Sequence, residues 1–227
     1  MTVLKLFLKR TIFFFLLIPL LVSCFELVED IRFNKNDSGT AKITFNGSKS
    51  KNRIDNIMEK DSMYGRPVPG TRDIVNKLEQ LKNVLNKVEG VHDVDYTTDF
   101  NQYVFSLSYN FDSPEALNKA VEVTQQQYEA GQLSGLPVEI KKTDKKFSRT
   151  LSEDYLKKLS SSLLKKGLFE VNNAKITLMY HFDHNIIRQT SVPSARISSN
   201  KKSVVIQHTL QDMLEKQQFI SMTIDFL

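Results

Sequence analysis

Residues 103–111 read YVFSLSYNF, and this stretch decides the fold. Large apolar side chains alternate with smaller or polar ones, which places all the large ones on one face of an extended strand. Residues of this kind suit a pleated, half-buried surface. The pattern predicts a central strand with one face in the core. Its large residues are Tyr103, Phe105, Leu107, Tyr109 and Phe111.

The segments on both sides extend this unit. Val94 and Tyr96 predict a preceding strand, joined through a turn at 99–102. Ser113 followed by Pro114 is typical of a helix start, with a capping residue and then proline in the first helical position. We expect that helix to run to about residue 130.

Further toward the N-terminus, residues 25–33 and 41–45 alternate in the same way around Asn36-Asp37-Ser38-Gly39, which predicts a hairpin. Residues 47–70 are polar and end in Pro-Val-Pro-Gly, which predicts a long loop with room for one helical turn at 54–58. From Thr71 apolar residues recur at a spacing of three and four up to Val88, which predicts an amphipathic helix.

The second half is less regular. Residues 131–149 look irregular and lysine-rich, with a short strand at 137–140, and Thr150 with Glu153 resembles a capping box that opens a helix to Gly167. Strands are expected at 174–182, 195–198, 203–208 and 219–226, with a short helix at 209–215. Residues 24–227 are thus predicted to form a single α+β domain: an antiparallel sheet built of hairpins with two to three packed amphipathic helices.

The first 23 residues have the layout of a secretory signal peptide that is removed on export. Lys5, Lys9 and Arg10 form a basic head, and a run of about a dozen mostly apolar residues follows. This run is too short to span a bilayer, which takes roughly 20 residues.

Leu21-Val22-Ser23-Cys24 resembles the lipobox of bacterial lipoproteins, in which cleavage between Ser23 and Cys24 leaves a thiol that carries acyl chains. The alternative is an ordinary signal with an incidental cysteine, but Cys24 is the sole cysteine, so no disulfide explains it. The resemblance implies attachment to a membrane of the bacterial envelope. Phe25 is not the aspartate associated with retention at the inner membrane, which favours the outer membrane.

Charge argues against a nucleic-acid partner. The chain has 31 basic and 26 acidic residues, and removal of the three basic residues of the leader leaves 28 against 26. Nucleic-acid binding needs a concentrated basic face. The mature charge balance therefore does not suggest such a partner.

Several features in order resemble the LppM-like lipoprotein domain of bacterial envelope proteins. They are the hairpin around NDSG directly after the lipid cysteine, a hairpin running into FDSPEALNKA (111–120), and a late aromatic strand LMYHF (178–182) followed by Arg196-Ile197-Ser198 and Lys202-Ser203-Val204-Val205. The resemblance implies an envelope protein without known catalytic residues that contacts a glycolipid or another envelope component. The polar insert at 47–70 and the absence of a C-terminal membrane helix depart from that family, and no site residue can be transferred.

The motifs of common enzymes are missing. The glycines do not form a dinucleotide fingerprint or a P-loop, and GQLSG (131–135) lacks the centred serine of a nucleophile elbow. The adjacent acids Glu29-Asp30 and Glu153-Asp154 are weak acid–base candidates, because neighbouring residues rarely face one substrate. We expect no catalytic residue and no cofactor.

Three local features carry alternative interpretations. His181 and His184 resemble a metal pair, but on a strand they point to opposite faces, and polar residues at a hairpin edge explain them better, so no metal is expected. Tyr103, Phe105 and Tyr109 can line an apolar ligand pocket or simply fill the core. A basic segment can contact anionic head groups or be a solvated loop; it comprises Lys141, Lys142, Lys145, Lys146 and Arg149.

The sequence therefore favours a non-catalytic, lipid-anchored envelope protein that binds a protein or a lipid- or glycolipid-like component. An envelope hydrolase whose carboxylates are brought together by the fold, and a scaffold subunit of an envelope complex, remain the alternatives.

Overall fold

A computed structural model describes residues 25–63, 66–129, 138–151, 174–190, 192, 194–209, 212 and 221–227. The leader, Cys24, nearly all of the helix expected between 150 and 167, and most of the short helix expected at 209–215 lie outside these residues. No helix within the described ranges is long and apolar enough to cross a membrane.

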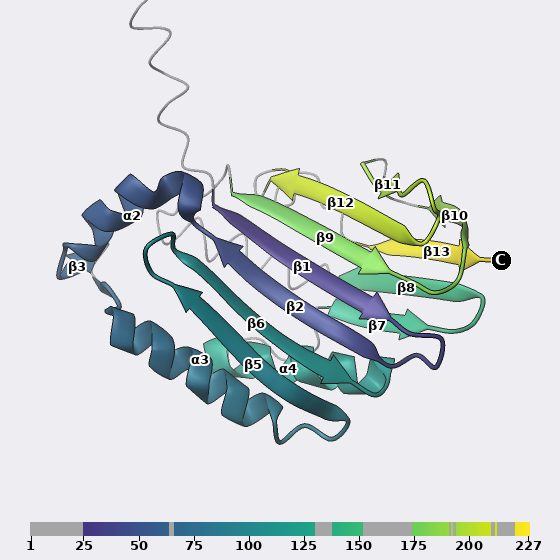
Figure 1. The fold of residues 1–227 in the computed structure, drawn as a ribbon, viewed down its shortest axis with the longest axis horizontal. Coiled ribbons are helices and arrows are strands. Elements are labelled where there is room, and N and C mark those ends of the chain that lie inside the picture. Colours follow the sequence, from purple (N-terminus) through teal and green to yellow (C-terminus); the bar gives the residue numbers. More distant parts are fainter. Residues whose placement is uncertain are drawn as a thin grey trace, which may run out of the picture.

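The larger of the two main sheets has seven strands in the order β11-β12-β9-β1-β2-β6-β5 (Figure 1). The two hairpins expected in the first half are present, and β2 pairs with β6 to join them. The bounds are β1 Glu26–Phe33, β2 Gly39–Asn46, β5 Val91–Asp99, β6 Val104–Phe111, β9 Lys175–His181, β11 Arg196–Ile197 and β12 Ser203–Thr209.

β1 and β9 run parallel, so this sheet is mixed and the expectation of a purely antiparallel sheet was wrong. Leu27 lies opposite Ile176 and Ile31 opposite Tyr180. Side-chain alternation is the same in parallel and antiparallel strands, so the residue pattern alone does not report strand direction. The α+β class itself agrees with the structure.

The smaller main sheet has the order β10-β13-β8-β7 and is antiparallel throughout. The short strand expected at 137–140 overlaps β7, whereas the residues of β8 were expected to be irregular, and Thr150 lies in β8 instead of opening a helix. Phe147, Arg149 and Leu151 alternate with exposed or half-buried residues, which makes this a strand with one buried face. The bounds are β7 Val138–Lys142, β8 Lys146–Leu151, β10 Ile186–Thr190 and β13 Met222–Phe226.

The segment 47–70 is more ordered than the long loop that we expected. It contains the short helices η2 (Ser48–Ser50) and α2 (Lys51–Met58), then a two-stranded ribbon of β3 (Ser62–Met63) and β4 (Arg66–Pro67). Lys51 pairs with Asp55 one turn later, with 2.9 Å between Nζ and Oδ2. The helical turn expected at 54–58 is thus part of a longer helix, which local pairs hold together with Ile54, whose side chain lies over Gly47.

Two longer helices flank the sheets. α3 (Thr71–Leu85) packs against β5, and α4 (Pro114–Glu129) packs mainly against β7. The Asn118 side chain of α4 bonds both backbone groups of Ile140: its Nδ2 donates to the carbonyl oxygen at 2.7 Å, and its Oδ1 accepts from the N–H at 2.8 Å. This reciprocal pair fixes α4 to the strand at the edge of the smaller sheet.

The core lies between the two main sheets and is rich in phenylalanine. Phe33 of β1 contacts Phe111 of β6, Phe147 of β8 and Phe182, with ring centroids 5.4–5.8 Å apart. Phe182 in turn contacts Phe226 of β13 at 4.9 Å. Rings from both sheets therefore meet in one cluster, and offset or edge contacts of this kind add to the free energy of burial.

Gly39 is required for this packing. A Cβ atom there would lie 1.9 Å from the Arg32 carbonyl oxygen and 2.6 Å from the Phe111 ring. The residue begins β2, opposite Phe33, at the point where the hairpin is closest to the core.

We expect Gly39→Ala to lower the free energy of unfolding by about 2–3 kcal/mol, because a rigid backbone and a buried ring must move. Urea denaturation followed by circular dichroism measures this loss. Gly70→Ala is the control, because its Cβ would meet only the Asp73 carboxylate at 3.5 Å. Equal midpoints for the two variants would contradict the close approach at Gly39.

Candidate functional site

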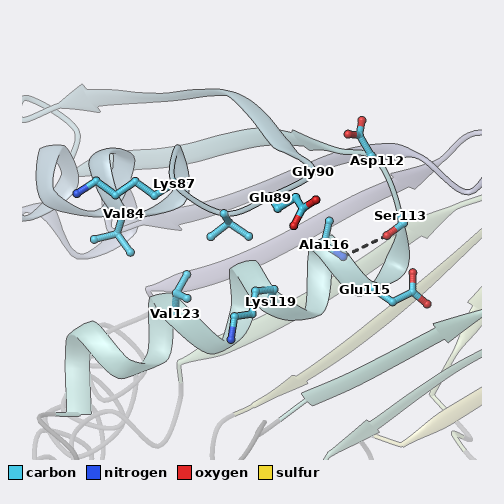
Figure 2. Close-up of a pocket in the computed structure, with 11 residues that line it drawn as sticks. Val84, Lys87, Glu89, Gly90, Asp112, Ser113, Glu115, Ala116, Lys119 and Val123 are labelled. Atoms are coloured by element: carbon cyan, nitrogen blue, oxygen red, sulfur yellow. Dashed lines mark hydrogen bonds between the residues drawn. The ribbon is translucent and has the colours of Figure 1, made fainter.

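A groove of about 780 Å³ lies between the end of α3 and the first half of α4 (Figure 2). Its apolar residues come from α3, from the turn that follows it and from α4, and its charged residues surround them. The apolar residues are Val84, Val88, Ala116 and Val123; the charged residues are Lys87, Glu89, Asp112, Glu115 and Lys119.

Two turns set the shape of the groove. Gly90 has a φ of +74°, a conformation that favours glycine, and its carbonyl oxygen accepts a hydrogen bond of 2.8 Å from the Asp112 N–H. Ser113 caps α4, since its Oγ accepts from the Ala116 N–H at 3.2 Å. The start of α4 is thereby held beside the end of α3.

The rim of the groove carries both signs of charge. Lys119 pairs with Glu122 at 2.8 Å, and His92 lies 3.7 Å from the Asp112 carboxylate. An apolar floor with a rim of mixed charge is typical of a site that binds and orients a ligand. Sequence reasoning missed this site, because its residues come from the end of α3, the turn after it and the start of α4, and the spacing of residues does not specify how these segments pack.

The three aromatic residues proposed as a ligand pocket do not come together in one. Tyr109 is buried in the core, and burial raises the pKa of its hydroxyl, as does the charge of Glu29. Phe105 stacks on Phe45 at 6.0 Å near the start of β1. Tyr103 leaves the strand with a φ of 52°, and its hydroxyl donates to Asp55 at 2.6 Å.

The basic segment divides into two groups. Lys141, Lys145 and Lys146 are exposed, but Lys142 and Arg149 are buried, so these two were wrongly expected to contact a surface. The reason is the alternation of side chains between the two faces of a strand. Lys142 follows Val138 and Ile140, and Arg149 lies between Phe147 and Leu151, on the inward faces of β7 and β8. That alternation was the signal that could have placed them.

Lys142 is an ion-pair partner inside the fold. Its side chain is inaccessible to solvent, and its Nζ donates to Asp37 in the turn between β1 and β2. The same Nζ lies 5.9 Å from the centre of the Phe33 ring and 6.0 Å from that of Phe226. A buried ammonium requires such partners, because an unpaired one is strongly unfavourable.

Arg149 forms a second charged contact between the sheets. Its Nε lies 3.6 Å from Oε1 of Glu29 on β1, and the Tyr180 hydroxyl of β9 donates to the same oxygen. Burial raises the pKa of Tyr180, with Glu29 adding to the shift. Burial alone would lower the pKa of Arg149, but Tyr180 and Glu29 raise it. Glu29 is thus occupied as a structural counter-ion.

The two histidines do not converge. His181 Nδ1 lies 2.8 Å from Ser203 Oγ and its Nε2 lies 3.2 Å from Asp30 Oδ1, while His184 packs on the Phe226 ring. Burial lowers the pKa of His181. In the described ranges, no group of three or more metal-binding side chains occurs. Ser203, His181 and Asp30 lie across β12, β9 and β1, away from the groove.

Comparisons with known proteins give one match. No family model matches the chain, and no curated protein matches it. A search of solved structures finds similarity to the folded domain of LppM from Mycobacterium tuberculosis, at 11% identity and a TM-score of 0.43, over 89% of this chain and 87% of that one. We transfer no residue role and no ligand from it.

We expect Lys142→Met to lower the free energy of unfolding by about 2 kcal/mol, because it leaves the Asp37 carboxylate without its partner. Adding Asp37→Asn should recover part of the loss, since asparagine tolerates the φ of 65° at this position. Denaturant titration of both single variants and the double variant measures the coupling.

Lys141→Met is the control for that experiment. The neighbouring lysine is exposed and pairs only with Glu139 on the surface, so its loss should change the free energy of unfolding by less than about 1 kcal/mol. A Lys142 variant as stable as this control would mean that the buried pair contributes nothing.

Proposed function

We propose that the protein is a lipoprotein of the bacterial envelope, anchored in the outer membrane by acyl chains on Cys24. Its role is to bind an envelope protein or a lipid- or glycolipid-like component, without catalysing a reaction on it. The groove between α3 and α4 supports binding, because it combines an apolar floor with charged groups of both signs.

The arrangement of acids gives no support to the hydrolase alternative. Glu29 is engaged by Arg149 and Tyr180 on the core side of β1, and Asp30, on the opposite face, lies beside His181. Glu153 and Asp154 lie outside the described residues. General acid–base catalysis needs two groups that reach one substrate, and these two neighbouring acids point apart.

The start of the fold supports the anchor. β1 begins at Glu26, two residues after the predicted lipid-bearing Cys24. The preceding Phe25 carbonyl oxygen accepts a hydrogen bond of 2.9 Å from the Lys175 N–H of β9. An acylated Cys24 would therefore hold the start of β1 close to the bilayer. Two or more acyl chains are sufficient for stable attachment.

Cys24→Ser tests the anchor. A serine hydroxyl does not replace the thiol that accepts the lipid, so we expect the variant to lose its acyl chains and its membrane attachment. Mass spectrometry of the N-terminal peptide and fractionation of cells expressing the full chain measure the two effects. The anchor is refuted if the variant keeps both.

Val84→Lys tests the groove. We expect native mass spectrometry of the wild-type chain, extracted from its own membrane, to detect a non-covalently bound ligand as added mass. In the variant, the fraction of protein that carries this ligand should fall at least about tenfold, because a charge in the groove opposes an apolar contact. Asn83→Lys is the control, since residue 83 is exposed and does not line the groove. Retention of the same mass by all three proteins would place binding elsewhere.

A further inference from the structure

Four turns and the strand ends beside them form one continuous end of the molecule, which we call the distal tip. It comprises residues 34–38, 143–146, 183–188 and 196–202. Backbone hydrogen bonds hold these parts together. The Ile186 N–H donates to the Lys201 carbonyl oxygen at 2.7 Å, and the N–H of Phe226, at the end of β13, donates to the Lys145 carbonyl oxygen at 2.9 Å. The buried pair of Lys142 and Asp37 joins the first turn to the second.

Basic residues predominate on the exposed surface of the distal tip. The exposed acids are Asp144 and Asp183, and the charge of Asp37 is already balanced internally by Lys142. Arg188 lies 3.5 Å from Asp225, but the pair is largely solvated. The exposed bases are Lys35, Lys145, Lys146, Arg188, Arg196, Lys201 and Lys202.

Exposed aliphatic residues lie in the same place. Among the described residues, Ile187 is 61% exposed and Ile197 is 40% exposed. Ile187 lies at an irregularity in the pairing of β10 with β13, which turns it away from the core. Apolar side chains combined with lysines and arginines are a composition found on surfaces that bind in the head-group region of a bilayer.

The distal tip lies at the opposite end of β1 from Phe25. β1 has eight residues, so its length separates the two by roughly 25 Å. Figure 1 shows the same separation: β1 starts at the left, and the β1–β2 turn, the β7–β8 turn, β10 and β11 lie at the right. The tip is therefore a second contact surface, distinct from the anchored end and from the groove.

We propose that the distal tip binds the surface of an anionic phospholipid bilayer, with its lysines and arginines on the phosphates and with Ile187 and Ile197 between the head groups. The observation that carries the proposal is the coincidence of an excess of exposed bases over acids and of exposed aliphatic side chains on one set of turns. Polyanions such as nucleic acid would use the bases but would leave both isoleucines in water. The inference rests on the proposed membrane anchor, to which it adds a second lipid contact.

The test uses the full chain anchored in neutral phosphatidylcholine vesicles, which offer the tip no anionic lipid of their own. Fluorescent acceptor vesicles of 70% phosphatidylcholine and 30% phosphatidylglycerol are then added, and captured acceptors are counted. Each basic residue near such a surface contributes about a fivefold gain in affinity. We therefore expect strong capture of these acceptors, no capture of pure phosphatidylcholine acceptors, and loss of capture in high salt.

Two matched pairs of variants locate the contact. Lys35→Glu, Lys145→Glu and Lys202→Glu together should reduce capture by at least about tenfold, whereas Lys49→Glu, Lys60→Glu and Lys77→Glu make the same change in net charge away from the tip and should leave it intact. Ile187→Ser should weaken capture. Leu27→Ser, at the other end of β1, should not.

The outcomes separate the two proposals. A chain that does not stay with the donor vesicles refutes the anchor. A chain that stays with them but captures neutral and anionic acceptors equally, or whose two triple variants behave alike, refutes the tip contact while leaving the anchor in place.

Discussion

The fold depends on charges buried between two sheets. Lys142 and Arg149 point into the core from the smaller sheet, and each meets an acid from the β1–β2 hairpin, Asp37 or Glu29. Unpaired, either cation would make the docked arrangement strongly unfavourable. Phenylalanine rings supply most of the apolar contact, but they pack in many ways. The two ion pairs favour this register between the sheets, because another register would leave Lys142 and Arg149 without Asp37 and Glu29.

The same constraint positions the surfaces that we assign to function. Pairing with Lys142 brings the β1–β2 turn against the β7–β8 turn and balances Asp37, which leaves the distal tip basic. Asn118 ties α4 to β7, so the smaller sheet also holds the inner wall of the groove beside α3. The start of β1, the groove and the tip are therefore three separate surface regions around one core.

Prediction from the sequence succeeded where a pattern is local. The alternation in 103–111, the NDSG turn and the capped helix after Ser113 each depend on neighbours within a few residues, and all three are present. It failed where partners are distant. The lysine-rich segment forms the hairpin of β7 and β8 with two buried cations, where only a short strand at 137–140 was expected, and β9 pairs with β1 in parallel although the two strands are far apart in sequence.

The sequence by itself determined the short-range structure: the strand faces and turns of the first half, and the α+β class. These follow from spacing, because alternation and capping act over a few bonds. Only the tertiary structure decided that Tyr109 is core, that Lys142 and Arg149 face inward, and that a groove forms between α3 and α4. Each outcome depends on which distant element covers one face of a strand or helix. The local spacing of residues does not specify that element, because it is selected by side-chain packing in three dimensions.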